Sequence, residues 1–155
     1  MSVNLNLLKE EIVNDPENLG YSSCLAIRDD IGLANIINLT RDTPAFNVPK
    51  GRISKDQFLE DTADIVFNLM LLESQGSNNA GFWLKVFDRL VANSDTINSE
   101  DPTLINLLDQ MVSDNLLNNT QKNLILNRQG SRSEVLFNCN VTIDQISNSL
   151  NEVNE

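Results

Sequence analysis

A four-residue signal for the start of a helix precedes an apolar segment three times in this sequence and constrains the fold more than any other feature. In this signal, Ser or Thr is followed three residues later by Glu or Gln, so that two exposed N–H groups are capped reciprocally. The occurrences are Ser54–Gln57, Ser131–Glu134 and Thr142–Gln145. Each leads into apolar residues at helical spacing. The sequence therefore predicts a chain built mainly from amphipathic helices.

Apolar residues recur at helical spacing in further segments, near residues 5–12, 29–39, 80–92 and 120–126. Another helix opens at Asp101-Pro102, because a proline in the first turn loses no hydrogen bond. The helix after Ser54 is expected to bury a stripe of Phe58, Ile65, Leu69 and Leu72, widened by Ala63, Val66 and Met70. We predict an all-α fold: a compact single-domain bundle of about six to seven short helices over residues 1–155, with a tail at 151–155 that can fray.

Residues 41–53 form the least periodic stretch, with two prolines and a glycine among them. We expect an extended Pro-containing loop here, with room for a short strand at Ala45–Val48. An ordinary surface loop is the simpler interpretation, since connecting segments normally run over the surface. The alternative is a segment that crosses to a neighbouring subunit.

The charge balance bears on possible partners. The chain has 11 Lys and Arg against 22 Asp and Glu, a net charge of −11. This composition argues against direct nucleic-acid binding, which needs basic side chains to displace counterions. No segment reaches the roughly 20 continuous apolar residues that span a bilayer. We therefore expect contact with neither nucleic acid nor membrane, and an acidic surface that favours solubility or a basic partner.

The chain contains no histidine, the commonest general base and metal ligand. Catalytic pairs of Ser or Cys with His, and zinc sites of Cys and His, cannot form; Cys24 and Cys139 are expected to be buried free thiols, although a disulfide between them is an alternative. Asp61 and Asp64 could bind a divalent cation, but a solvated acidic helix face explains them more simply. The sequence predicts a protein without catalytic residues, metal or other cofactor.

Several aromatic, aliphatic and basic residues are candidates for contact with a partner protein. Trp83 is either a core residue or an interface anchor. The apolar arc from Leu104 to Val112 belongs either in the core or in a subunit contact. Basic residues either meet acids of a partner or order the local loop and helix start. The candidate interface residues are Phe46, Val48, Lys50, Arg52, Trp83, Leu104, Leu108, Met111 and Arg132.

Motifs at both ends resemble those of a group of small proteins encoded by tailed bacteriophages. Leu8 to Ile12, Asp15-Pro16 and Gly20-Tyr21 are similar to the group's opening, L-x-x-E-I-x-x-D-P-x-x-x-G-Y. Leu33 to Asn38 resembles its helix motif L-A-x-x-L-N. Gly130 to Phe137, followed by Val141-Thr142, resembles its close, G-S-R-A-E-x-L-F-G and V-T. Asn138 stands where the group often has Gly, and the middle from Arg41 to Asn119 matches by helix pattern alone.

The resemblance implies a non-enzymatic virion structural protein of the head–tail neck or connector, the tail or the capsid surface. Its partners would be other phage structural proteins and further copies of itself, in a particle assembled in the host cytoplasm. A second hypothesis is a small acidic phage protein that binds a host factor or mimics DNA inside the infected cell. An enzyme of unknown type ranks last, because the resemblance transfers no catalytic residue.

Overall fold

The computed structural model describes residues 2–92 and 94–151. Within these residues, most helices begin at a side chain that caps the first turn. Both halves of the reciprocal cap form at Ser131 with Glu134 and at Thr142 with Gln145. At Ser54 only one half is observed: its hydroxyl accepts from the Gln57 N–H, while the Gln57 side chain donates to Asp61 instead. Local sequence thus determines where these helices start. At Ser54, the hydrogen bond from Gln57 to Asp61 replaces half of the cap.

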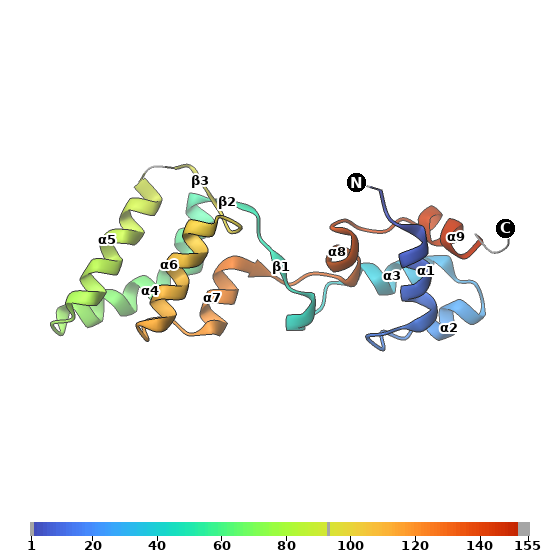
Figure 1. The fold of residues 1–155 in the computed structure, drawn as a ribbon, viewed down its shortest axis with the longest axis horizontal. Coiled ribbons are helices and arrows are strands. Elements are labelled where there is room, and N and C mark those ends of the chain that lie inside the picture. The colour runs from blue at the N-terminus through green and yellow to red at the C-terminus, as the bar shows by residue number, and fades with distance from the viewer. Residues whose placement is uncertain (1, 93, 152–155) are drawn as a thin grey trace. The chain divides into compact units, whose positions relative to one another are not determined.

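The fold is mainly helical, as predicted, with nine α-helices, one 3-10 helix and four short strands among the described residues (Figure 1). The elements in chain order are α1 Leu5–Asn14, α2 Tyr21–Ala26, α3 Asp30–Asn38, η1 Pro44–Phe46, β1 Val48–Pro49, β2 Arg52–Ser54, α4 Lys55–Ser74, α5 Asn78–Ala92, β3 Thr96–Asn98, α6 Pro102–Ser113, α7 Asn119–Leu126, β4 Asn127–Arg128, α8 Arg132–Phe137 and α9 Ile143–Asn151.

The chain divides into two compact units. Unit 1 comprises Met1–Val48 and Gln129–Glu155, and unit 2 comprises Pro49–Arg128. In sequence, unit 2 is therefore inserted between the two halves of unit 1. Each unit has a hydrophobic cluster of its own, and no residue belongs to both. The sequence predicts a single domain. That stays a prediction, because two compact units form one domain if they unfold together.

Unit 1 is held together by pairs of helices from its two chain segments. Helix α9 packs against α1 and α3, and α8 packs against α3 and η1. Its core is mostly aliphatic, with one buried tyrosine and one phenylalanine. The buried residues of its hydrophobic cluster are Val3, Leu8, Ile12, Tyr21, Leu33, Ala34, Ile37, Phe137, Val141, Ile146 and Leu150.

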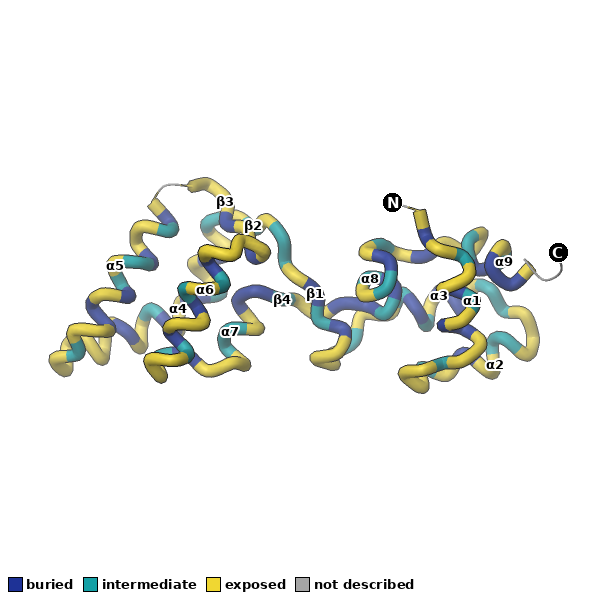
Figure 2. The backbone as a smooth tube through the Cα atoms, in the orientation of Figure 1, coloured by how far each residue is buried: buried dark blue, intermediate teal, exposed yellow. Residues whose placement is uncertain are grey.

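Unit 2 packs α4 against α5 and α7, and α6 against α7. Strands β2 and β3 pair antiparallel, with Ile53 opposite Ile97, and lie beside α4. The rings of Phe58 and Phe87 stack with centroids 6.1 Å apart, joining α4 to α5 within the core. Figure 2 shows that exposed positions nevertheless recur along α4 and α5.

Several sequence predictions about individual elements need correction. Helix α2 was not expected, because six residues carry too little periodicity to reveal it. The stretch expected as a strand at Ala45–Val48 begins instead as the 3-10 turn of Pro44–Phe46, and strand residues start at Val48. Strand β3, which pairs with β2, was not expected either. Of the tail, Asn151 ends α9, and residues 152–155 lie outside the described residues.

The buried faces of two helices also differ from prediction. On α4, Met70 and Leu72 are 57% and 37% exposed, whereas Thr62 is fully buried. On α7, Leu124 is 67% exposed and Ile125 is buried. The cap of α7 is Asn118, whose side chain forms a reciprocal cap with Gln121. Apolar spacing predicted these helices correctly, but it could not select between two apolar faces.

Candidate functional site

The motif residues of both chain ends meet in unit 1 around one buried carboxylate, Glu11. This side chain lies on α1 and is only 4% exposed. Arg132, in the first turn of α8, binds it with two hydrogen bonds, Nε to Oε1 and Nη2 to Oε2, both 2.9 Å long. The flat guanidinium matches a carboxylate in this bidentate arrangement. The sequence predicts that Arg132 either meets acids of a partner or orders the local loop and helix start. In the structure, Arg132 instead binds a distant segment of its own unit.

Tyr21 completes this cluster, which we call the Glu11 cluster (Glu11, Tyr21 and Arg132). Its hydroxyl donates to Glu11 Oε1 at 3.5 Å. Burial raises the pKa of the Tyr21 hydroxyl well above its usual range, and the nearby carboxylates of Glu11 and Asp15 raise it further. The hydrogen bond with Glu11 likewise raises the pKa of Arg132. At neutral pH the cluster therefore holds a neutral tyrosine beside a charged pair.

Asp15 and Gly20 shape the turn that delivers Tyr21 to the cluster. The Asp15 carboxylate accepts hydrogen bonds from the backbone N–H groups of Leu19, at 2.6 Å, and Gly20, at 2.8 Å. Gly20 has a φ of 91°, a left-handed conformation that glycine adopts at little cost, as the sequence predicts. The aspartate and glycine of the opening motif thus have a shared structural role.

The remaining motif residues join the same unit through backbone contacts. Asn38, the last residue of the α3 motif, donates to the Val141 carbonyl at 2.7 Å and accepts from the Val141 N–H at 2.9 Å. Gly130 lies so close to the chain that an added Cβ would come within 2.5 Å of the Phe46 carbonyl oxygen. Asn138 adopts a left-handed φ of 56° at the end of α8, so it takes the conformation that a glycine there would favour.

Most of the predicted interface residues lie in the interior of their own unit. Phe46 and Val48 are buried in unit 1, where the Arg41 guanidinium lies over the Phe46 ring. Within unit 2, the core contains Trp83, Leu104, Leu108 and Met111. For these residues the core alternative describes the structure, because their side chains present little area to a partner.

Two basic interface candidates on unit 2 differ in their surroundings. Lys50 forms an ion pair with Asp61, Nζ to Oδ2 at 2.8 Å, and also donates to the Leu124 carbonyl. Asp61 is thereby held by Lys50 and Gln57, whereas Asp64 is exposed. Arg52 on β2 is exposed. The contact role predicted for Lys50 and Arg52 stays a prediction.

The structure reveals an exposed apolar surface that sequence reasoning missed. On α4, exposed side chains include Leu59 (42%), Phe67 (68%) and Met70 (57%). Phe82 on α5 is 57% exposed and touches Trp83 edge to face. The signal in the sequence was a second run of apolar residues on α4, which we assigned to a single widened stripe.

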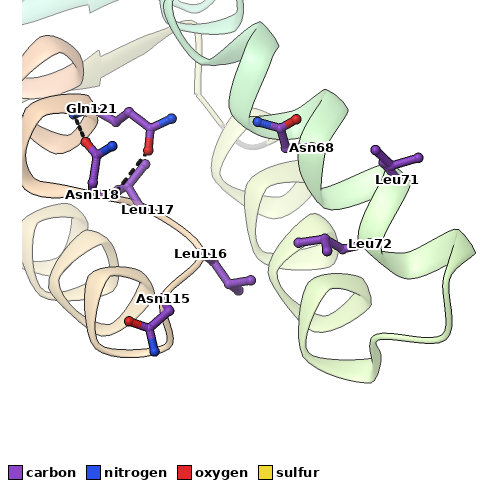
Figure 3. Close-up of a pocket in the computed structure, with 8 residues that line it drawn as sticks. All are labelled: Asn68, Leu71, Leu72, Asn115, Leu116, Leu117, Asn118 and Gln121. Atoms are coloured by element: carbon purple, nitrogen blue, oxygen red, sulfur yellow. Dashed lines mark hydrogen bonds between the residues drawn. The ribbon is translucent and has the colours of Figure 1, made fainter.

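A groove in unit 2 adjoins the C-terminal half of α4. Leu72 of α4 points toward Leu116 of the α6–α7 connection, across a groove of about 430 Å³ that Leu71 and Leu117 also line (Figure 3). Its polar rim consists of Asn68, Asn115, Asn118 and Gln121. The lining is apolar and amide, without a charged side chain, so it suits contact with a neutral chain segment better than binding of an ion.

Other features of the described residues limit the kinds of site available. Cys24 and Cys139 are free, partly buried thiols that pack against the core of unit 1. Within residues 2–92 and 94–151, no group of three or more Asp, Glu or Cys side chains is arranged to hold a metal ion. In the same residues, no helix is long and apolar enough to cross a membrane. No protein-family model, curated protein or solved structure matches this chain.

Proposed function

We propose that this chain is a non-enzymatic structural protein of a bacteriophage particle, located in the neck or connector, the tail or the capsid surface. It folds as one helical module and acts through contacts with other phage structural proteins. Several copies of it are present in each particle. It uses no cofactor, and it binds neither nucleic acid nor membrane directly. Assembly takes place in the host cytoplasm.

The observation that carries this proposal is the convergence of the motif residues in unit 1. Arg132 of the closing motif binds Glu11 of the opening motif, which also accepts a hydrogen bond from Tyr21, and Asn38 contacts the backbone of Val141. Short motifs that match by chance have no reason to pair with each other in space. Their pairing supports a resemblance that covers one folded unit, and it explains the motif residues by packing and hydrogen bonding rather than by reaction chemistry.

The location of the unmatched middle of the chain supports the same proposal. The part that matched by helix pattern alone, Arg41 to Asn119, lies mostly in unit 2, which is inserted into unit 1. Unit 2 also carries the exposed apolar residues of α4 and α5. Large exposed apolar patches on a protein commonly mark contacts with other proteins. We assign the resemblance to unit 1 and much of the contact surface to unit 2.

Proteomics of purified particles tests the proposal directly. Particles of the encoding phage would be purified by density gradient, washed in high salt and treated with protease before mass spectrometry. We expect peptides of this chain at an abundance comparable to other minor structural proteins. Host ribosomal proteins, quantified in the same sample, control for contamination.

Absence from washed particles, together with abundance in the lysate of infected cells, would overturn the proposal. That result would favour the second hypothesis, an acidic protein that binds a host factor or mimics DNA. Its net charge of −11 is compatible with that alternative, but charge of this kind also serves solubility alone.

A further inference from the structure

Three acidic side chains lie in a row on α4. Asp56, Glu60 and Asp64 follow one another at intervals of four residues, so they lie on one side of the helix, and all three are exposed. Among the residues that the structure describes, none of the three carboxylates forms an ion pair or a hydrogen bond. These residues, which we call the acidic row, are therefore open to a group from outside the chain.

The acidic row works against the stability of its own helix. Like charges four residues apart repel each other, and the row contains two such pairs, Asp56 with Glu60 and Glu60 with Asp64. Lys55, the only basic residue of α4, is never three or four positions from these acids, the spacings at which it would attract them. The helix dipole favours an acid in the first turn, as at Asp56, but Glu60 and Asp64 lie beyond that turn. The folding of unit 2 does not explain this arrangement.

Other acids of unit 2 have partners within the unit. Asp61 of α4 forms an ion pair with Lys50, and Asp109 of α6 forms one with Lys122. Asp101 caps the first turn of α6. The fold thus gives these carboxylates a cation or a helix end to bind and gives the acidic row neither. A cation from another molecule would supply what is missing.

Exposed apolar side chains continue the acidic row and lie beside it. Phe67 and Leu71 follow Asp64 by three and seven residues on the same side of α4, and they are 68% and 50% exposed. Leu59 and Met70, beside the row, are 42% and 57% exposed. The acidic row and these four apolar residues form the outer face of α4, which is roughly 22 Å long at 1.5 Å per residue. A molecule that covers this face needs both positive charge and apolar surface.

We propose that the outer face of α4 binds a basic amphipathic helix of another protein. Lys or Arg side chains of that helix pair with the acidic row, and its apolar side chains cover Phe67 and Leu71. A second copy of this chain does not provide such a helix through α4, which has one basic residue against five acids. The proposal applies to a phage protein and to a host protein alike, so it does not depend on the proposed role in a particle.

Binding of a model peptide to the full chain tests the proposal. The probe is an amidated helical peptide of about 18 Leu and Lys residues, roughly 27 Å long, with its leucines on one face. A peptide in which Glu replaces each Lys is the control. Fluorescence anisotropy is measured in about 0.15 M salt, where charges more than about 8 Å apart are largely screened, so the net charge of the chain contributes little. We expect saturable binding of the lysine peptide and none of the glutamate peptide.

Two identical substitutions separate the acidic row from general attraction. Asp64→Lys and Asp88→Lys change the charge equally at exposed positions of α4 and α5, and Asp88 already has Lys85 three residues before it. Asp64→Lys should weaken binding of the lysine peptide at least about tenfold, because like charges then meet across the interface. Asp88→Lys should change it less than about twofold. Unfolding followed by Trp83 fluorescence should show no loss of stability in Asp64→Lys, because the lysine removes a like-charge repulsion.

Phe67→Ser tests the apolar part of the outer face. It should weaken binding of the lysine peptide about tenfold, because the ring is then no longer covered, and it leaves the core of unit 2 intact. Absence of saturable binding, equal binding of the glutamate peptide, or equal effects of Asp64→Lys and Asp88→Lys would each overturn the proposal. Self-association of the wild-type chain in sedimentation equilibrium that Phe67→Ser abolishes would also overturn it, because the face would then belong to a second copy.

Discussion

Arg132 and Glu11 are 121 residues apart in sequence, yet they form a bidentate ion pair between α8 and α1. The Glu11 side chain is 3% exposed and that of Arg132 14%. Removing one partner of a buried pair leaves an uncompensated charge, which costs more than the intact pair contributes. The pair therefore joins the two chain segments of unit 1 and makes each depend on the other.

Glu11→Gln should destabilise unit 1 strongly. The amide keeps the size of the side chain but removes the buried counterion of the Arg132 guanidinium, which then has only the exposed Glu17 carboxylate, 3.7 Å from Nη1. Because breaking a buried pair costs about 3–5 kcal/mol, we expect a loss of up to that size. Urea denaturation followed by circular dichroism measures the change. The matched control is Glu10→Gln, at the exposed neighbouring position, which should change stability by less than about 0.5 kcal/mol. Equal effects of the two substitutions would exclude a structural role for the pair.

Alkaline pH should destabilise unit 1 through Tyr21. An unfolded tyrosine has a pKa of about 10, and burial raises the pKa of Tyr21 in the folded state above that. The folded protein thus holds this proton more tightly than the unfolded chain does. The stability contribution is complete below pH about 10 and is lost as pH rises from there toward the folded-state pKa.

Tyr21 is the only tyrosine in the chain, so tyrosinate absorbance reports it alone. We expect tyrosinate to appear only above pH about 10 in the folded protein, and together with unfolding. Tyr21→Phe should remove this part of the pH dependence and leave the titration of lysines and cysteines. If tyrosinate forms in the folded protein with an ordinary pKa, Tyr21 is not held as the structure indicates.

Asn38 should contribute to stability through both of its amide atoms. It donates to the Val141 carbonyl and accepts from the Val141 N–H, so no single-function side chain can replace it. Asn38→Asp keeps the acceptor but sets a carboxylate against the carbonyl oxygen. We expect a loss of about 1–3 kcal/mol for either Asn38→Asp or Asn38→Ala. Asn35→Asp on the exposed side of α3 is the control in thermal unfolding, and an equal loss there would contradict this role.

Local signals in the sequence predicted much of the fold, because a cap depends on residues only three positions apart. The reciprocal caps at Ser131 and Thr142 and the helix start at Pro102 are confirmed. The cap at Ser54 is observed only in part, because the Gln57 side chain donates a hydrogen bond to Asp61. Asp61 also accepts a hydrogen bond from Lys50. That network includes a residue from outside the helix, which local spacing cannot reveal.

Long-range pairing explains what sequence reasoning missed at the candidate site. In the sequence of α1, Glu11 is one of two adjacent acids, and only the position of Arg132 shows why it is buried. Similarly, periodicity predicted one widened apolar stripe on α4, but the packing of α5 and α7 decides which part of it becomes the core. The apolar residues left outside, such as Phe67, are therefore visible only in the folded structure.

The separate cores of the two units make a final prediction about cooperativity. Leu108 is 1% exposed in the core of unit 2, and Leu108→Ala should cost that unit about 2–5 kcal/mol. Trp83, the only tryptophan, reports unit 2 by its fluorescence, and hydrogen exchange of peptides from α1 and α9 reports unit 1. Because the clusters share no residue, we expect Leu108→Ala to lower the unfolding midpoint of Trp83 fluorescence while protection in α1 and α9 stays unchanged. Ile37→Ala, in the core of unit 1, is the matched variant and should show the reverse. If either substitution shifts both readouts equally, the chain unfolds as the single domain that its sequence predicts.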